Sequence, residues 1–143
     1  MDITVRRANK SELDWINLCY REVNFLASDY ETEIIAIVEV EGEKAGLGRL
    51  VKINNEVWEL GGMLVLEGYR SLGLSKKIIK FLLEQVSETT IYCIPFENLF
   101  ALYNSMGFEI VTDIGVVPKK VIDKFEWCKK TYPTDVLLLK QVV

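Results

Sequence analysis

The chain has 143 residues, half of them hydrophobic and 27% charged, and a formal net charge of −4. This length suits a single domain with its own core, and the composition is typical of soluble globular proteins. The net negative charge argues against a nucleic-acid-binding protein, because phosphate binding needs a basic surface. Since the sequence has no histidine, a serine–histidine triad and a histidine-ligated zinc site are excluded, and we expect no metal cofactor.

The apolar runs have the length of strands, well short of the roughly 20 residues that span a bilayer. The N-terminal stretch MDITVRRANK also lacks the apolar core of a signal peptide. We therefore expect a cytoplasmic protein that does not act at a membrane. Cys19, Cys93 and Cys128 lie far apart in apolar patterns, which favours buried, inert thiols over disulfides or a metal site.

Hydrophobic periodicity and turn residues predict strands and helices in the order β-α-β-β-β-α-β-α-β-α-β. Ser11 and Asp14 would form a capping box at the first helix, and Gly107 would end the third. Inside the fourth strand, the pair Gly61-Gly62 marks a bulge or a close approach of backbones. An antiparallel meander followed by a β-α-β crossover predicts an α/β (α+β) fold with a mixed sheet between helices. The predicted elements cover residues 2–6, 12–27, 34–40, 45–53, 56–66, 73–86, 91–94, 97–106, 108–114, 119–130 and 135–140.

The segment EGYRSLGLSKK, residues 67–77, joins the fourth strand to the second helix. Free backbone N–H groups and the positive end of the helix dipole would meet there, and Gly73 has no side chain to exclude a phosphate. The segment fits neither a P-loop, G-x-x-x-x-G-K-[ST], nor a dinucleotide fingerprint, G-x-G-x-x-G. Taken alone, these residues allow both an anion site and an ordinary strand-to-helix connection.

The wider stretch ELGGMLVLEGYRSLGLSKKIIKFLLE resembles the central motif of the GNAT superfamily of N-acetyltransferases. In that motif the strand leads into [QR]-x-x-G-x-[GA] and a long helix; here the string is Arg70-Ser71-Leu72-Gly73-Leu74-Ser75, with Ser75 where Gly or Ala is usual. The later stretch ALYNSMGFEIV is similar to a second motif, in which Tyr103 precedes Gly107-Phe108. The resemblance implies one GNAT domain over residues 1–143, with a mixed sheet of about 6–7 strands that splays between strands 4 and 5.

The resemblance also implies that acetyl-CoA is the cosubstrate. Backbone groups of Leu64 and Val65 would pair with its pantetheine arm, and Gly61-Gly62 would be a bulge that makes room for the arm. Asn98 would lie near the arm, although its distance from Tyr103 is shorter than usual in the family. The loop residues around the diphosphate would be Arg70, Ser71, Leu72, Gly73, Leu74 and Ser75.

Acetyl transfer to an amine requires loss of the amine proton, a polarised thioester carbonyl and a stabilised leaving thiolate. By resemblance, Tyr103 is the candidate acid that protonates the coenzyme A thiolate; its alternative role is that of a packed tyrosine. Glu59 is the candidate general base, although many relatives use water and Glu59 could simply be an outward-facing strand residue. Because direct transfer is the family's usual route, no acyl intermediate on Cys93 or Cys128 is expected.

The acceptor is expected to be an amine of a small molecule or a peptide. The acidic residues Asp29, Glu31 and Glu33 follow the first helix and would favour a cationic amine, unless they form only a solvated loop. The lysines of the helix 119–130 are expected to face solvent. They are Lys119, Lys120, Lys124, Lys129 and Lys130.

Two alternatives to an enzyme follow from the same residues. A non-catalytic acyl-CoA-binding regulatory module would keep the loop without needing Tyr103 or Glu59, and a structural domain would bind no ligand. The apolar last strand could pair with a second copy of the chain. The expected partners are therefore an amine substrate and a homodimer partner, with no nucleic acid and no membrane.

Overall fold

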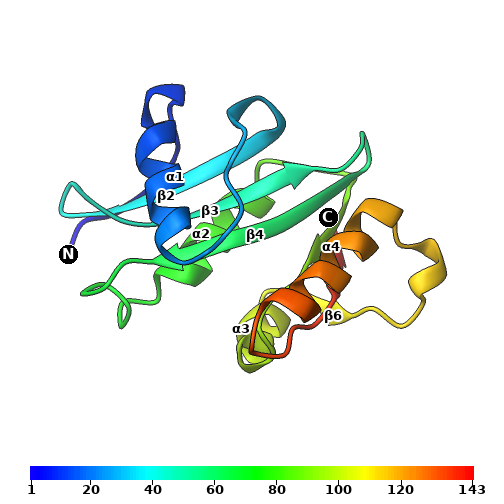
Figure 1. Ribbon diagram of the computed structural model, residues 1–143. Coiled ribbons are helices and arrows are strands. Elements are labelled where there is room, and N and C mark those ends of the chain that lie inside the picture. The colour runs from blue at the N-terminus through cyan, green and yellow to red at the C-terminus, as the bar shows by residue number, and fades with distance from the viewer. The chain divides into compact units, whose positions relative to one another are not determined.

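The computed structural model describes all 143 residues and has its strands and helices in the predicted order (Figure 1). None of the helices combines the length and the apolar character that crossing a membrane requires. The strands are β1 Ile3–Arg7, β2 Glu33–Val40, β3 Glu43–Lys52, β4 Val57–Val65, β5 Thr90–Cys93, β6 Glu109–Ile110 and β7 Leu139–Val142. The α-helices are α1 Leu13–Glu22, α2 Leu74–Leu83, α3 Phe100–Ser105 and α4 Lys119–Thr131.

The strands form a seven-stranded sheet in the order β1-β2-β3-β4-β5-β7-β6. β4 and β5 run parallel, whereas β1–β2, β2–β3, β5–β7 and β6–β7 are antiparallel pairs. The predicted mixed sheet is therefore confirmed. β4 pairs with β5 only as far as Leu60 and Cys93, and it then continues to Val65 without a β5 partner.

The chain forms two compact units that divide within β4. The N-terminal unit comprises residues 1–51 and 62–85, and the C-terminal unit comprises residues 52–61 and 86–143. The predicted loop and the Gly62 half of β4 belong to the N-terminal unit. Glu59, Tyr103 and α4 belong to the C-terminal unit.

β2 forms the centre of the N-terminal unit and is buried on both faces, as its nearly continuous apolar sequence predicts. Ile35 and Ile37 pack in one cluster with Tyr20 of α1. α2 packs against β1 and β2 as well, and Figure 1 shows α1 and α2 on opposite sides of these strands. Gly48 of β3 allows the helix to approach closely, since a Cβ there would lie 2.8 Å from the side chain of Ile78.

α1 is shorter than predicted and has a different start. The prediction of Ser11 and Asp14 as its capping box is wrong. Instead, the Asn9 N–H donates to the Glu12 carboxylate over 2.9 Å, and a 3₁₀ turn at 10–12 leads into the helix. The helix ends at Glu22 because the chain turns back two residues later, where Asn24 has a left-handed φ of +61°.

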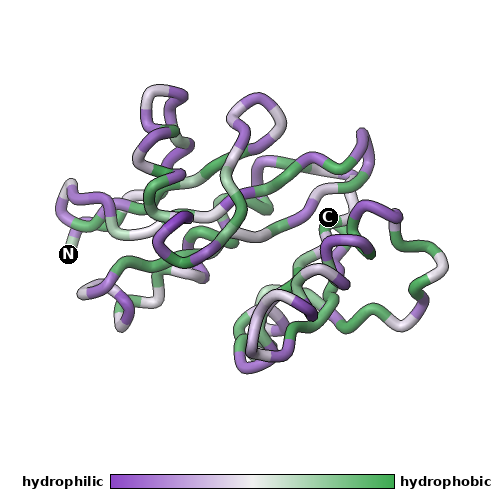
Figure 2. The backbone as a smooth tube through the Cα atoms, viewed as in Figure 1, coloured by the Kyte–Doolittle hydropathy of each residue, from purple (hydrophilic) through white to green (hydrophobic).

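The core of the C-terminal unit lies beneath α4. Tyr92, Val121 and Leu138 form its buried centre, with Val57 and Phe125 packed against them. Figure 2 shows hydrophilic and hydrophobic residues interleaved along α4, as expected for a helix with one buried face.

β7 begins later than predicted. Residues 135–137, expected to start the strand, instead form irregular backbone bonds with residues 95–97. The Leu137 N–H donates to the Pro95 carbonyl over 2.9 Å, and the Glu97 N–H donates to the Asp135 carbonyl over 2.8 Å. β6 is likewise reduced to the pair Glu109–Ile110, whereas a longer strand was predicted. The sheet therefore loses its regular ladder near Pro95, which has no N–H to donate.

Candidate active site

The loop after β4 is held to the strand end by its own residues. The Arg70 Nε donates to the Val65 carbonyl over 3.1 Å, and the Tyr69 N–H donates to the Leu66 carbonyl over 3.1 Å. Gly68, with a φ of +92°, lets the chain reverse between them. Arg70 thus closes a turn in the structure, while its side chain remains exposed.

The N-terminus of α2 has the properties of an anion site. Gly73 is its N-cap residue, in a left-handed conformation with a φ of +69°, and no side chain caps the first turn. A Cβ at Gly73 would meet no atom within 4 Å, so the space beside the loop is open. The first turn contains no acidic residue, whereas Lys76 and Lys77 are exposed there. Unpaired N–H groups, the helix dipole and two cations therefore all favour a bound anion.

Leu64 and Val65, which were predicted to bind the pantetheine arm, turn their backbone groups to opposite sides of β4. The Leu64 carbonyl faces β3, where it would lie 2.8 Å from a Cβ on Gly46. Because neighbouring residues of a strand turn their backbone groups to opposite sides, the backbone groups of Val65 face away from β3. Val65 therefore presents the strand edge that a ligand could pair with, although its carbonyl already accepts from Arg70.

Gly62, in the pair predicted to form a bulge, lies against a buried polar network in the N-terminal unit. Gly62 has a φ of +60°, and its carbonyl accepts from the Tyr20 hydroxyl over 2.8 Å. A Cβ at Gly62 would lie 2.5 Å from the Tyr20 hydroxyl oxygen and 2.8 Å from the Arg49 Nε. Arg49 stacks on the Tyr20 ring at 4.3 Å and donates to the Ser28 hydroxyl over 2.6 Å. Only glycine fits this position, for both its backbone angle and its surroundings.

The acidic stretch after α1 is engaged within its own unit. Glu33 is buried beside Arg49, with 3.8 Å between Oε1 and Nη1, and its Oε2 accepts from the Asp29 N–H over 2.7 Å. Glu31 pairs with Lys10 at 2.8 Å, and the Asp29 carboxylate accepts from the Glu31 N–H. Each of the three acidic side chains therefore has a partner within the chain.

In the C-terminal unit, Tyr103 lies on α3 and is 4% exposed. Its ring packs edge-on against Phe108, with centroids 6.0 Å apart and planes at 81°. Burial, with a smaller contribution from the charge of Cys93, raises the pKa of Tyr103 far above its ordinary value. The side chain therefore keeps its proton at physiological pH and can donate a hydrogen bond.

Glu59 is 4% exposed and faces α4. The Lys124 Nζ donates to Glu59 Oε1 over 2.9 Å. The expectation that Glu59 could be an outward-facing strand residue is therefore wrong. Two buried thiols lie near this carboxylate: burial raises the pKa of both Cys93 and Cys128, and the negative charge of Glu59 adds to each increase. A raised pKa keeps a thiol protonated at physiological pH and makes it a poor nucleophile.

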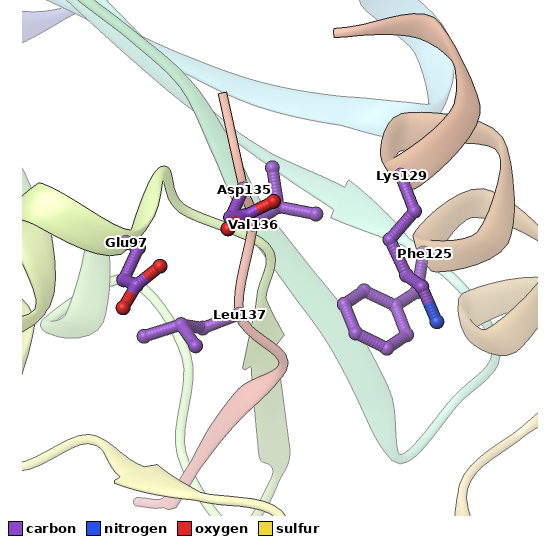
Figure 3. Close-up of a pocket in the computed structure, with 6 residues that line it drawn as sticks. All are labelled: Glu97, Phe125, Lys129, Asp135, Val136 and Leu137. Carbon is purple, nitrogen blue, oxygen red and sulfur yellow. The ribbon is translucent and has the colours of Figure 1, made fainter. Parts of the chain in front are cut away.

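Asn98 lies exposed on the one-turn 3₁₀ helix Glu97–Leu99. This turn borders an open cleft of about 460 Å³ within the C-terminal unit (Figure 3). The figure shows Glu97 and Asp135 across the cleft from two α4 side chains, Phe125 and Lys129. The Lys129 ammonium lies 4.9 Å from the centre of the Phe125 ring. The described residues contain no cluster of three or more acidic or sulfur ligands that could hold a metal ion.

Sequence reasoning missed three residues of these arrangements: Tyr20, Arg49 and Lys124. The sequence does indicate that Arg49 is special, because it is the only charged residue in the apolar stretch 45–51. The same is true of Lys124, since it falls three residues after Val121 and four before Cys128, on the apolar stripe of its helix. A charge at a buried position implies a buried partner. The partners, however, come from distant parts of the sequence.

The family comparison covers most of the chain. Residues 5–108 match the family model described as "Acetyltransferase (GNAT) family". A search of the curated proteins returned none that matches. The matched range includes the loop, Glu59 and Tyr103, and it ends before α4.

Solved structures agree in fold. Arabidopsis thaliana Naa50, in complex with the bisubstrate analogue CoA-Ac-MVNAL, is 13% identical with a TM-score of 0.72, and all of both chains is covered. A GNAT family acetyltransferase from Elizabethkingia anophelis with acetyl-CoA bound is 17% identical with a TM-score of 0.68, over 99% of this chain and 98% of that one. N-acetylglutamate synthase from Neisseria gonorrhoeae, complexed with coenzyme A and L-arginine, is 13% identical with a TM-score of 0.69 over 95% of this chain. This chain spans only about a third, 32%, of that synthase.

Proposed function

Because the chain belongs to the acetyltransferase (GNAT) family, we propose that it transfers an acetyl group from acetyl-CoA directly to a primary amine. The acceptor would be an amine of a small molecule or a peptide. The observation that carries the proposal is the open, uncapped N-terminus of α2 beside Gly73, in a chain of this family. Related folds have been solved with acetyl-CoA and with a coenzyme A–peptide analogue bound, which supports the same donor here.

In this proposal the donor is held by the N-terminal unit. The backbone amides of Arg70, Ser71, Leu72, Gly73, Leu74 and Ser75 would surround the diphosphate, with Lys76 and Lys77 adding positive charge. The arm would pair with the edge of β4 at Val65, past the point where β5 ends. Leu64, whose carbonyl faces β3, would contribute its side chain rather than its backbone. The role of Asn98 near the arm stays a prediction from the sequence.

The chemistry would use two residues of the C-terminal unit. The amine nitrogen attacks the thioester carbonyl carbon, so that a C–N bond forms and the C–S bond breaks. Glu59, directly or through a water, would take the proton that the amine loses. The Tyr103 hydroxyl would donate a hydrogen bond to the departing thiolate. Because its pKa is raised, Tyr103 would stabilise the thiolate by that bond more than by complete proton transfer.

Two matched glycine variants test donor binding. Gly73→Ala and Gly68→Ala both place a side chain at a left-handed φ where a Cβ would meet no atom within 4 Å. Their effects on folding should therefore be similar, at about 1 kcal/mol each. Titration calorimetry with acetyl-CoA should show a weakened affinity for Gly73→Ala and a smaller loss for Gly68→Ala. Equal affinities in the two variants would contradict a diphosphate site at Gly73.

The second candidate function is a non-catalytic acyl-CoA-binding module. It is favoured by one observation, that the Glu59 carboxylate is already occupied by Lys124. Release of free thiol from acetyl-CoA, measured with a panel of amines and peptides, separates the two functions. An enzyme should also lose about a hundredfold to a thousandfold in kcat on Tyr103→Phe, the loss typical of one transition-state hydrogen bond. Acetyl-CoA binding without thiol release on any amine would favour the binding module.

A further inference from the structure

Lys124 differs from the other lysines of α4. Four of these lysines are exposed, and two of those four make surface pairs on the helix, Lys119 with Asp123 and Lys129 with Glu126. The expectation that all five face solvent is wrong for Lys124, whose side chain is 27% exposed and reaches Glu59 on β4. The exposed lysines are Lys119, Lys120, Lys129 and Lys130.

The pair is a contact between segments that are far apart in sequence but lie in one unit. Glu59 and Lys124 are 65 positions apart, and both belong to the C-terminal unit. The carboxylate side chain is 5% exposed, whereas the lysine stem lies partly in solvent. Lys124 supplies the cation that compensates this buried carboxylate, with 2.9 Å between its Nζ and Glu59 Oε1.

A lysine ammonium and an acceptor ammonium are the same chemical group. Both are primary alkylammonium ions that donate short hydrogen bonds to a carboxylate oxygen. An amine that binds Glu59 at Oε1 must therefore exchange with Lys124. The exchange is physically open to Lys124 because its stem is flexible and its ammonium can return to solvent.

We propose that Lys124 is a tethered competitor for the acceptor amine at Glu59, and that it makes the site selective for cationic primary amines. This inference rests on the proposed function, because it takes Glu59 as the group that receives the amine. A neutral acceptor cannot replace the charge of Lys124 and would leave two ions without partners. A primary alkylammonium replaces that charge in full. Lys124 lies outside residues 5–108, the part that the family model covers.

Steady-state kinetics with n-butylamine, which matches the lysine side chain in chain length and charge, test the competition. Lys124→Met keeps the length of the side chain and removes its charge. The KM for n-butylamine should fall about fivefold at constant kcat, the change expected when a partly exposed ion pair no longer competes. Lys124→Arg should keep the parent KM. Lys120→Met, at an exposed position one turn earlier on α4, is the matched control and should also keep it.

An unchanged or increased KM in Lys124→Met would overturn the inference, as would an equal decrease in Lys120→Met. Absence of n-butylamine turnover in both the parent protein and Lys124→Met would overturn it as well. The proposed function fails only if the whole amine panel releases no thiol. Thermal unfolding of each variant shows whether it is folded under the assay conditions.

A second measurement tests the pair without turnover. The parent protein and Glu59→Gln are treated with a low dose of the succinimidyl ester of acetic acid, and labelling at each lysine is read by peptide mass spectrometry. Labelling of Lys124, relative to Lys120, should be low in the parent protein and should increase in Glu59→Gln, because an ion-paired ammonium reacts slowly. Equal relative labelling in both proteins would show that Glu59 does not hold Lys124, and would overturn the inference.

Discussion

The two units of this protein differ in how far solvent reaches the partner of a buried charge. In the N-terminal unit, the side chains of Arg49 and Glu33 are 5% and 6% exposed, and Arg49 also contacts Ser28 and Tyr20. In the C-terminal unit, Glu59 is equally buried, but its partner Lys124 is 27% exposed. A network buried on all sides fixes the backbone around it, whereas a pair with one flexible and partly solvated member can exchange that member. The first arrangement is suited to shaping β4, and the second to admitting a ligand.

The largest expected effect is that of removing Arg49 from the buried network of the N-terminal unit. This variant tests how much the network contributes to the free energy of unfolding. Arg49→Met leaves the buried Glu33 carboxylate without its cation, so the free energy of unfolding should fall by about 3–5 kcal/mol. Lys124→Met should have a smaller effect, because solvent reaches the pair. Urea unfolding measures both, with Arg7→Met, at an exposed position on β1, as the control. If Arg49→Met were no more destabilising than Lys124→Met, the distinction between the two pairs would not hold.

Gly62→Ala tests whether the network also requires the absence of a side chain at position 62 of β4. Gly42→Ala is the matched control, because Gly42 has a φ of +80° and a Cβ there would meet no atom within 4 Å. Both variants lose about 1 kcal/mol to the left-handed backbone. Gly62→Ala should lose about 1–3 kcal/mol more, because its Cβ would collide with Tyr20 and Arg49. Equal decreases in the free energy of unfolding of the two variants, measured with urea, would show that Tyr20 and Arg49 can move aside at little cost.

The two buried tyrosines give a comparison at alkaline pH. Burial raises the pKa of Tyr20 in the N-terminal unit and of Tyr103 in the C-terminal unit, both above the ordinary value of 10.0. Above that pH the unfolded chain loses these protons while the folded chain keeps them, so stability should fall as pH rises, by about 1.4 kcal/mol per pH unit for each tyrosine. Tyr20→Phe and Tyr103→Phe should each reduce this slope. A variant with the parent slope would show that its tyrosine ionises normally in the folded protein.

The smallest expected effect is that of an open ion pair in the N-terminal unit. Arg6 donates to both carboxylate oxygens of Glu12, at 2.9 and 2.8 Å, and lowers the pKa of Glu12 from 4.5 to about 2. The pair therefore stabilises the protein above about pH 4.5, and this contribution is lost as the pH falls towards 2. Glu12→Gln should flatten the loss of stability over that window by up to about 1 kcal/mol, since the pair is partly solvated. The measurement is the unfolding midpoint of the parent protein and of Glu12→Gln as a function of pH between about 5 and 2. Parallel curves for the two proteins would contradict the prediction.

The sequence predicts best where the evidence is local. The order of elements, the loop around Gly73 and the close approach of other groups at Gly62 were readable, because each is set by neighbouring residues and by hydrophobic period. The end of α1 was missed because a left-handed Asn24 stops the helix where the apolar pattern continues. The start of β7 was missed for a tertiary reason, the irregular bonds of residues 135–137 to residues 95–97.

The candidate site shows the same limit. Tyr103 and Glu59 could be nominated from motifs, but not the partner of Glu59, because no local pattern encodes a pair 65 positions apart. The acids after α1 were nominated for an acceptor amine on charge alone, and Lys10 and Arg49 engage two of them instead. Charge patterns name the groups present, and only the fold decides which of them remain available to a ligand.

The division of the chain within β4 also has a consequence for the order in which the protein is made. Every residue of the N-terminal unit precedes Val86, so this unit can fold while the rest of the chain is still being synthesised. The C-terminal unit must wait, because β5 pairs with β7, Leu139–Val142, which is synthesised only after α3, β6 and α4. Until β7 is made, one edge of β5 is exposed, which leaves the nascent chain prone to wrong pairing.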